Sequence, residues 1–422
     1  MKDLPNGLSS LDVKHICKQY LIEKNASDLF DLPIKVIEYD LNGNGDGPSG
    51  FLADHQLLMV LVERLLTDGS KKQDRLKFFL KSAPAAQSRL DYITEIGVFA
   101  KEVNVYSVVL PTLQKYVHDR YFAPRCYYSK EDILVMEDLN EQGFRLGTGR
   151  DGIFDMDHLK CCLKALATFH GSSIVFEEKS GKSINQTYPL ATTENAYPKD
   201  NEARTTNFMN GTAALMELIK VLPKYKSQLD LILKKFPEKM KLIFEYTKTS
   251  SEFRNVFQHG DLWANNVMFK HFNKRPVECR FVDFQLTRYA PPIVDVITVL
   301  TIPTAKAFRS QHLKELLDFY YQCLKDFVET HNLKLEDHLS KAEFDKTAET
   351  FKIIGIIESL LFSHLTILPS ESTKSLTETS DGFTDFFNLY RNEIVLKAFK
   401  NDSIYRERLT DMLEDMIESY IL

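Results

Sequence analysis

The chain has no excess of basic charge and no paired cysteine motif, and each absence excludes a class of protein. Its 53 Lys and Arg residues are outnumbered by 59 Asp and Glu residues, so the net charge is −6. Such a surface offers no basic field for nucleic acid or for an anionic membrane. The six cysteines form no C-x-x-C pair, which argues against zinc and disulfide frameworks and favours a reducing cytosol.

Long apolar runs are also missing. The N-terminus reads MKDLPNGLSSLDVKHICKQY and has no apolar signal core. The longest apolar runs, such as Leu57 to Val62, are far shorter than the ~20 residues that span a bilayer. We therefore expect a soluble, unprocessed, cytoplasmic protein without a membrane span, and no feature points to an obligate protein partner.

The apolar pattern changes from strand-like to helix-like near Asn140. The first third alternates short extended runs with glycine-rich turns, which is typical of an antiparallel sheet. In the remainder, apolar residues mostly recur at helical spacing. We expect an α+β fold in three parts: an N-terminal helical extension over 1–30, a lobe with the sheet and one main helix over 31–139, and a mostly helical lobe over 140–422.

Two helices can be located in more detail. In the first, apolar residues step by three and four along one face: Ile93, Ile96, Phe99, Val103, Tyr106 and Leu110. Pro111 is expected to end this helix because proline has no N–H to donate. In the second, LKCCLKALATFHG, we expect His170 at the C-terminal end and Gly171 in the cap.

Residues 255–283 interrupt the helical half with strand-like runs. NVMFK and VECRFVDF flank the turn segment HFNKRP, which predicts a β-hairpin. A turn centred near Lys274 and Arg275 would place Asn266 opposite Asp283 in antiparallel register. Two oxygen-bearing side chains would then share one end of the hairpin.

This end of the hairpin has the residue types that phosphoryl transfer needs. Magnesium prefers oxygen ligands and usually takes one or two from protein, as Asn266 and Asp283 would supply. An acceptor hydroxyl needs a carboxylate to orient it and to accept its proton, and protein kinases place that Asp five residues before the metal-binding Asn. Asp261 has this spacing from Asn266. Taken alone, HGD-x-x-x-x-N is also compatible with a polar loop that caps a strand.

HGDLWANN followed by VDFQ resembles the aminoglycoside-phosphotransferase and choline-kinase branch of the kinase-like fold. Trp263, together with DFQLTRYAPPIVDV, is most similar to the ecdysteroid kinase-like family of insects, also called choline/ethanolamine-kinase-like. The similarity runs from about Val36 to Phe387. It implies a bilobal protein kinase-like fold that uses ATP and Mg²⁺, with Asp261 as catalytic base and Asn266 and Asp283 as metal ligands.

The resemblance also implies a strand lysine that contacts the ATP phosphates and pairs with a helix glutamate. Lys81 is our choice because it stands just before Ser-Ala-Pro, as the family's lysine does, although Lys77 shares its strand face and is also eligible. Glu102 in FAKEVNVY matches the family's F-x-x-E-x-x-x-Y, and Glu95 on the same helix face is its competitor. A solvent-facing side chain is the alternative for both.

A glycine-rich segment is a further candidate for nucleotide contact. Gly45-x-Gly47-x-x-Gly50 lies between two expected strands, where Gly47 and Gly50 would let backbone N–H groups approach phosphates. A glycine-rich hairpin turn explains the segment equally well.

The strand DILVMEDL resembles the lobe connector that holds adenine through its main chain, here at Met136, Glu137 and Leu139. A buried edge strand is one alternative. A role for the carboxylates of Glu137 and Asp138 at the mouth of a substrate site is another.

Three residues are expected to support the site rather than to react. By similarity with the family, His259 braces the catalytic loop and Asp295 hydrogen-bonds to that loop. We interpret Trp263 as a packing anchor in preference to a substrate platform, since aromatic residues are mostly buried in the core.

These features together predict an ATP-dependent small-molecule kinase that transfers the γ-phosphate to a hydroxyl of an ecdysteroid-like or other hydroxylated molecule. Choline, ethanolamine, an aminoglycoside-like sugar and a xenobiotic are alternative acceptors. A catalytically silent pseudokinase that binds ATP or an apolar ligand is the alternative of a different class. A phosphoprotein substrate is disfavoured because the chain has no A-P-E segment after Asp283.

Overall fold

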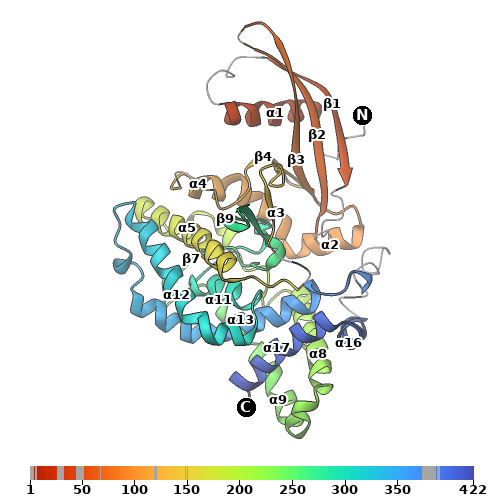
Figure 1. Ribbon diagram of the computed structural model, residues 1–422, viewed down its shortest axis with the longest axis vertical. Coiled ribbons are helices and arrows are strands. Elements are labelled where there is room, and N and C mark those ends of the chain that lie inside the picture. Colours follow the sequence, from red (N-terminus) through yellow and green to blue (C-terminus); the bar gives the residue numbers. More distant parts are fainter. Residues whose placement is uncertain are drawn as a thin grey trace.

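The computed structural model describes residues 4, 7–25, 33–43, 52–66, 68–117, 121–147, 149, 151–372, 386 and 390–422. An antiparallel sheet stands at one end of the molecule and a larger helical body at the other (Figure 1), which confirms the α+β class. Gly45, Gly47 and Gly50 lie outside the described residues, so their contact with phosphate stays a prediction. The expected limits of the three parts of the chain stay predictions as well.

The N-terminal sheet has five antiparallel strands in the order β1-β2-β3-β5-β4. Their bounds are β1 Ile34–Gly43, β2 Asp54–Leu65, β3 Lys71–Ser82, β4 Cys126–Lys130 and β5 Ile133–Glu137. Alternation along β3 puts Leu76, Phe78 and Leu80 into a core shared with helix α1 (Ser10–Asn25), while Lys81 faces the opposite side. Burial of this apolar face fixes the register of β3, because a shift by one residue would expose it.

The main helix of this part is bent where the sequence predicts one continuous helix. Gly97 adopts φ 66° between α2 (Gln87–Ile96) and α3 (Val98–Asn104), a left-handed conformation that glycine takes without strain. The arms Gln87–Ile96 and Val98–Gln114 are bent by 64°. In the described ranges no single helix has the length and apolar composition of a membrane span, and this bent pair passes such a test only when both arms are taken together.

Pro111 does not end this helix, contrary to the prediction. A π-helical turn, Val105–Val109, precedes it, and the N–H of Leu110 donates to the carbonyl of Val105. The last helical segment, α4 (Leu110–Gln114), then has Pro111 in its first turn. The proline follows directly on this π-helical turn, where the regular i→i−4 hydrogen-bond pattern is already interrupted, so the helix can continue past a residue without an N–H.

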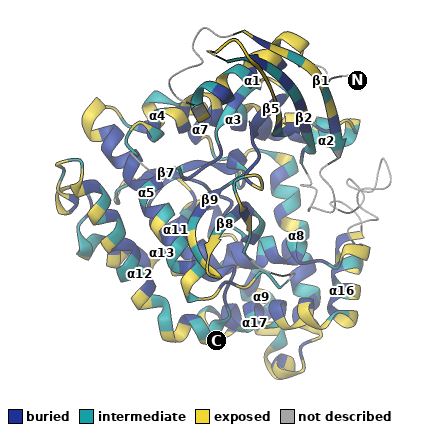
Figure 2. Ribbon diagram, turned by 45° about the horizontal axis from the view of Figure 1, so that its top comes forward, coloured by how far each residue is buried: buried dark blue, intermediate teal, exposed yellow. Residues whose placement is uncertain are grey.

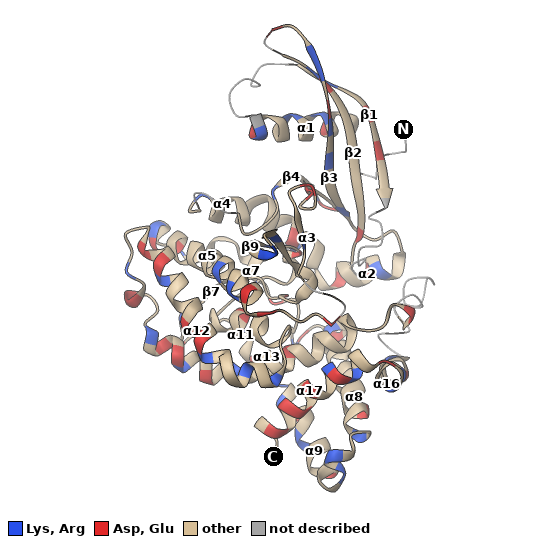
Figure 3. Ribbon diagram, in the orientation of Figure 1, with Lys and Arg blue, Asp and Glu red and all other residues tan. Residues whose placement is uncertain are grey.

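The helical body packs around α11 (Ile293–Thr301), in which every residue is buried (Figure 2). The surrounding helices are α5 Met156–Ser180, α6 Ile184–Thr187, α7 Pro189–Thr192, α8 Glu202–Lys220, α9 Leu229–Met240, α10 Ile243–Tyr246, α12 Lys306–Glu329, α13 Lys341–Thr366, α16 Arg391–Asn401 and α17 Ser403–Tyr420. α11 is apolar on nearly all sides, as a central helix must be. Acidic and basic residues are interspersed along outer helices such as α12 and α17 (Figure 3).

α13 packs closely on α11 because Gly355 has no side chain. A Cβ at Gly355 would lie 2.5 Å from Oγ1 of Thr301 and 2.9 Å from the carbonyl oxygen of Ile297. Gly355→Ala is therefore expected to lower the free energy of unfolding, measured with urea, by about 1–3 kcal/mol. Gly149→Ala is the control, since a Cβ there would meet only Asp151, at 3.7 Å; equal effects of the two substitutions would contradict this account of the packing.

α5 continues through His170, contrary to the expected end at this residue. The helix runs to Ser180, and Gly181, with φ 68°, caps it. Gly171 instead faces α12, where a Cβ would overlap the ring of Phe327. Glycine at this position lets α5 pack closely against α12, and the local sequence does not indicate this contact.

The remaining strands form two small sheets. β7 Val256–Gln258 pairs with β10 Arg288–Ala290, and β8 Val267–Phe272 lies between β6 Phe144–Leu146 and β9 Arg275–Phe281. The β-hairpin of β8 and β9 is confirmed, but its turn is at Asn273 and Lys274, one residue before the predicted centre. Both turn residues have positive φ, which suits a two-residue hairpin.

The predicted register of this hairpin is wrong by one residue. Asn266 lies opposite Val282, whose N–H donates to the carbonyl of Asn266 at 3.0 Å. Asp283 comes one residue later and adopts φ 68°. The turn position and an irregularity between Lys270 and His271 set this register, and neither can be read from the pattern of apolar residues.

Candidate active site

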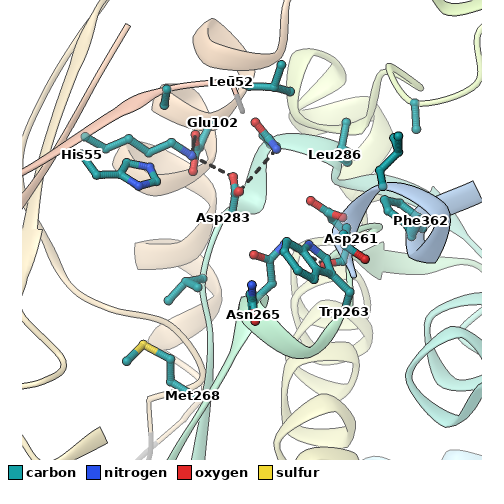
Figure 4. Close-up of a pocket in the computed structure, with 18 of the residues that line it drawn as sticks. Leu52, His55, Glu102, Asp261, Trp263, Asn265, Met268, Asp283, Leu286 and Phe362 are labelled. Atoms are coloured by element: carbon teal, nitrogen blue, oxygen red, sulfur yellow. Dashed lines mark hydrogen bonds and ion pairs between the residues drawn. The ribbon is translucent and has the colours of Figure 1, made fainter. Parts of the chain in front are cut away.

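A cavity of about 1080 Å³ lies between the N-terminal sheet and the helical body. Residues from β2, β3, α3 and β5 line one side, and residues from the hairpin ends, α8 and α13 line the other. Pockets for one small ligand usually measure about 300–1,000 Å³, so this cavity lies just above the upper end of that range. Figure 4 shows the region around Asp261 and Asp283.

Lys81 is held by two carboxylates inside the cavity. Its Nζ lies 2.7 Å from Oε2 of Glu102 on α3 and 2.8 Å from Oδ1 of Asp283 (Figure 4). Because β3 is hydrogen-bonded to strands on both sides, the sheet fixes the position of the lysine. The two competitors lie elsewhere: Lys77 forms its salt bridges outside this group, and Glu95 is exposed.

Burial and charge oppose each other in this group. Burial alone would lower the pKa of Lys81, but the carboxylates of Asp283 and Glu102 outweigh it and raise that pKa. Burial raises the pKa of Glu102 to about 7, although the charge of Lys81 opposes this shift. One cation faces two carboxylates, so the group has an excess of negative charge when both are ionised.

The loop that carries Asp261 is braced from behind. Asp295 on α11 accepts the backbone N–H of His259 at 2.7 Å and that of Gly260 at 3.0 Å. The ring of His259 accepts the N–H of Asp261 on Nδ1 at 3.2 Å and donates from Nε2 to the carbonyl of Val282 at 3.0 Å. Burial lowers the pKa of His259, and the neutral ring satisfies both hydrogen bonds.

Two buried residues that the sequence analysis did not assign to the site complete this bracing. Nε2 of His170 lies 3.2 Å from Asp295. Arg288 donates to the carbonyl of Gly260 at 2.8 Å and forms an ion pair with Glu358 at 3.1 Å. The sequence could have pointed to these two residues only as a polar or charged residue within an apolar stretch. Their hydrogen-bond partners are far away along the chain, so no local motif links them.

Asp261 has a carboxylate oxygen without a partner in the cavity wall. The residue is 4 % exposed, and within the described part of the chain its Oδ1 accepts no hydrogen bond. Burial, followed by the negative charge of Asp283, raises the pKa of Asp261 well above its ordinary value. Because buried polar atoms are nearly always hydrogen-bonded, this oxygen indicates a place for a ligand that donates a hydrogen bond to it.

Asn266 and Asp283 fit the requirements of a magnesium ion. Nδ2 of Asn266 donates to the carbonyl of Asp261 at 2.9 Å, so Oδ1 is the side-chain atom left to bind a cation. Asp283, two residues after the end of β9, is held in a left-handed conformation, and such conformations of non-glycine residues concentrate at functional sites. One amide oxygen and one carboxylate, in a group with excess negative charge, match the protein ligands that Mg²⁺ usually takes.

The connector after β5 lines the cavity with Met136, Glu137 and Leu139. The carboxylate of Glu137 forms an ion pair with an arginine of β9, and that of Asp138 lies 3.1 Å from a lysine of β3. Both carboxylates therefore have protein partners. This arrangement argues against the alternative in which they face a cationic substrate.

The position of Trp263 differs from that of a packing anchor. The side chain is only partly buried and lies in the cavity wall beside Asp261 (Figure 4). In the described part of the chain it belongs to none of the hydrophobic core clusters. The sequence motif identifies Asp261 as a site residue, but it does not show whether the side chain of Trp263 points into the core or into the cavity.

Comparison with solved structures finds a distant likeness over nearly the whole chain. Choline kinase LicA from Streptococcus pneumoniae is 12% identical, with a TM-score of 0.37 over 92% of this chain and 98% of that chain. The GDP complex of aminoglycoside 2'-phosphotransferase-IIIa is 14% identical, with a TM-score of 0.40 over 94% and 98%. The microcompartment-associated aminopropanol kinase is 11% identical, with a TM-score of 0.44 over 96% and 97%. Values this low carry no argument about function.

The comparison by sequence family is specific. A search of curated protein sequences finds no match. The model of the ecdysteroid kinase-like family, however, matches residues 56–333, which include Lys81, Glu102, Asp261 and Asp283. This span is well over half of the chain, and the protein therefore belongs to the ecdysteroid kinase-like family.

Proposed function

We propose that the protein is an ATP-dependent kinase that transfers the γ-phosphate to a hydroxyl group of a small molecule. The observation that carries this proposal is the set of charges in one cavity: Lys81 bound by Glu102 and Asp283, and close by Asp261, whose Oδ1 has no partner among the described residues. A fixed cation suits phosphate oxygens, and a buried carboxylate suits an acceptor hydroxyl. Membership of the ecdysteroid kinase-like family supports the same activity.

ATP would lie against β3 and the connector after β5. Lys81 would neutralise phosphate oxygens, and the main chain at Met136, Glu137 and Leu139 would hold adenine. The N–H of Glu137 already donates to the carbonyl of Arg125 at 2.9 Å, and the carbonyl of Leu139 already accepts the N–H of Phe144 at 3.0 Å. We therefore assign the carbonyl of Glu137 and the N–H of Leu139 to the adenine edge.

Asn266 and Asp283 would hold Mg²⁺, which when bound supplies positive charge to the ATP phosphates. Lys81 keeps the carboxylate of Asp283 in place through its ion pair. The bond from Nδ2 of Asn266 to the carbonyl of Asp261 keeps the amide oriented. Both ligands are thus fixed by contacts already present in the protein.

Asp261 would orient the acceptor hydroxyl and take its proton. Its raised pKa makes it a stronger base than a surface carboxylate. The bonds from Asp295 and His259 to the loop hold this carboxylate still, and positioning of this kind supplies much of the rate of phosphoryl transfer.

The acceptor is proposed to be an ecdysteroid-like or other hydroxylated apolar molecule, such as a xenobiotic. Apolar and aromatic side chains line one region of the cavity: Tyr92 of α2, and Tyr197, Phe208, Leu361, Phe362 and Leu365 of the helical body. A wall of this kind buries a hydrocarbon skeleton. Choline and ethanolamine are small cations and would leave most of this wall without contact.

The test is γ-phosphate transfer from Mg·ATP to a panel of ecdysteroids, plant phenols, sugars, choline and ethanolamine, together with a thermal shift in Mg·ATP. A protein that binds ATP must be stabilised by it. Transfer to an apolar alcohol supports the proposal. ATP binding without transfer to any acceptor would favour a silent ligand-binding protein instead.

Trp263→Ala is expected to raise KM for an apolar acceptor by about 10-fold, because the indole in the cavity wall contributes roughly 1.4 kcal/mol of apolar contact. KM for ATP should change little, since the indole lies on the Asp261 side of the cavity. Trp263→Phe, which keeps an aromatic ring, is the control. A rise in KM for ATP as large as that for the acceptor would show that the indole does not belong to the acceptor site.

A further inference from the structure

The helical end of the cavity combines apolar walls with arginine. The cavity-lining residues of α8, α13 and α16 include two charged side chains, Arg204 and Arg391, and no carboxylate. In the view of Figure 4, Phe362 of α13 lies on the opposite side of Asp261 from His55 and Asp283. The carboxylates that line the cavity come from elements outside these three helices, and the described part of the helical end presents positive charge.

Arg204 is a buried cation without a counter-charge in the described part of the chain. It is 8 % exposed, and its Nε and Nη2 atoms have no hydrogen-bond partner. Its guanidinium lies 5.8 Å from the centre of the Tyr92 ring, and it forms no ion pair with any Asp or Glu that the structure describes. A buried guanidinium that lacks hydrogen-bond acceptors is strongly unfavourable.

Other buried arginines of this protein, such as Arg288 and Arg309, have carboxylate partners, and a further one, Arg408, donates to backbone carbonyls. Arg288 lies 3.1 Å from Glu358, and Arg309 lies 2.6 Å from Asp415. In all three cases the guanidinium has an acceptor from another part of the chain. Arg204, which lines the cavity, departs from both arrangements, because its Nε and Nη2 have neither a carboxylate nor a carbonyl partner among the described residues.

Arg391 and His364 add polar groups beside Arg204. Arg391 donates from Nη1 to the backbone carbonyl of Asn207 at 2.9 Å and from Nη2 to its Oδ1 at 2.5 Å. Arg204 and Asn207 stand three residues apart on α8, so they share one face of the helix. Nδ1 of His364 lies 2.9 Å from the carbonyl of Leu360, to which it donates, and its Nε2 has no partner among the described residues.

His364 contributes no positive charge to this end of the cavity. Burial, helped by the charge of Arg391, lowers its pKa to about 3. The neutral ring therefore offers a hydrogen-bond acceptor on Nε2. Burial lowers the pKa of Arg391 only to about 10, so this arginine is charged at neutral pH.

We propose that the acceptor of this kinase carries an acidic group, a carboxylate or a sulfate, which Arg204 binds through Nε and Nη2 while the charge of Arg391 adds to the attraction. The inference rests on the proposed kinase function and narrows its substrate to hydroxylated apolar acids. A guanidinium binds such oxyanions through two parallel hydrogen bonds. Cationic acceptors are disfavoured by the same charges.

The test measures binding by calorimetry with matched pairs of probes: cholate and methyl cholate, ferulate and methyl ferulate, and estriol 3-sulfate and estriol. For at least one pair, the acid is expected to bind about 10- to 100-fold more tightly than its neutral partner. Arg204→Met should reduce this ratio to near one and leave binding of the neutral partner unchanged. Arg204→Lys should keep part of the preference.

Arg75→Met is the control, since it removes the same charge from an exposed position on β3. Equal affinity of acid and neutral partner in every pair, or a preference that survives Arg204→Met, would overturn the inference. The wild-type ratios decide it even if a variant fails to fold. Because they are measured without nucleotide, failure of the kinase proposal is seen separately, as the absence of a thermal shift in Mg·ATP.

Discussion

Asp261→Asn is expected to lower kcat by about 10²- to 10⁴-fold, the usual contribution of a positioned general base. Asparagine has nearly the same shape as aspartate but takes no proton from the acceptor hydroxyl. The backbone contacts of the loop to Asp295 and His259 do not involve this side chain. The loss should therefore appear in kcat, while the affinity for Mg·ATP stays the same within about twofold.

The same substitution is expected to leave the protein at least as stable as the wild type. Burial and Asp283 raise the pKa of Asp261 in the folded state above its unfolded value. A group shifted in this direction reduces stability as pH rises through the folded pKa, and an uncharged side chain has no such cost. The melting temperature of the variant relative to wild type should therefore increase with pH.

Single-turnover transfer and melting curves at several pH values check both parts of this expectation. Asp230→Asn, at an exposed position of α9, is the matched control and should change neither quantity. A kcat within tenfold of wild type would remove Asp261 from the role of base. Loss of Mg·ATP binding in the variant would instead place this carboxylate in the nucleotide site.

Much of the nucleotide side of this site could be predicted because its geometry is local. Alternation along one strand limits the lysine to Lys77 or Lys81, and helical spacing limits the glutamate to Glu95 or Glu102. The fold then brings Lys81 and Glu102 to within 2.7 Å of each other. Which member of each pair enters the cavity depends on how the helix sits on the sheet, and the bend at Gly97 sets this.

The acceptor side could not be predicted because it depends on contacts between distant segments. Arg204, His364 and Arg391 come from three helices that no sequence motif links. Similarly, His170 reaches Asp295 only because α5 runs on past the expected cap. Patterns of apolar spacing locate helices, but they do not say which polar residues meet in the assembled core.

The second large effect is expected for Lys81→Met, which removes the cation shared by Glu102 and Asp283. Glu102 is 1 % exposed. An ionised carboxylate left without its partner at such a site should lower the free energy of unfolding by about 3–5 kcal/mol. Glu102 can avoid part of this loss by binding a proton, since burial raises its pKa to about 7 even with Lys81 present.

The size of the loss should therefore depend on pH. Without Lys81 the folded pKa of Glu102 rises further above its unfolded value, so folding is coupled to proton uptake between the two values. Stability in this range falls as pH rises, and the deficit of Lys81→Met relative to wild type should be larger at about pH 8 than at about pH 6. Urea unfolding at both pH values measures the difference, with Lys71→Met, exposed on the same strand, as control.

Adding Glu102→Gln to Lys81→Met isolates the cause. The amide fills the same space without a charge, so the double variant should recover most of the stability lost at pH 8 and should lose the extra dependence on pH. It should still fail to bind Mg·ATP tightly, because the cation proposed to neutralise the phosphates is absent. A deficit that is equal at both pH values and persists in the double variant would show that packing of the lysine stem, and not the charge of Glu102, holds this end of the site together.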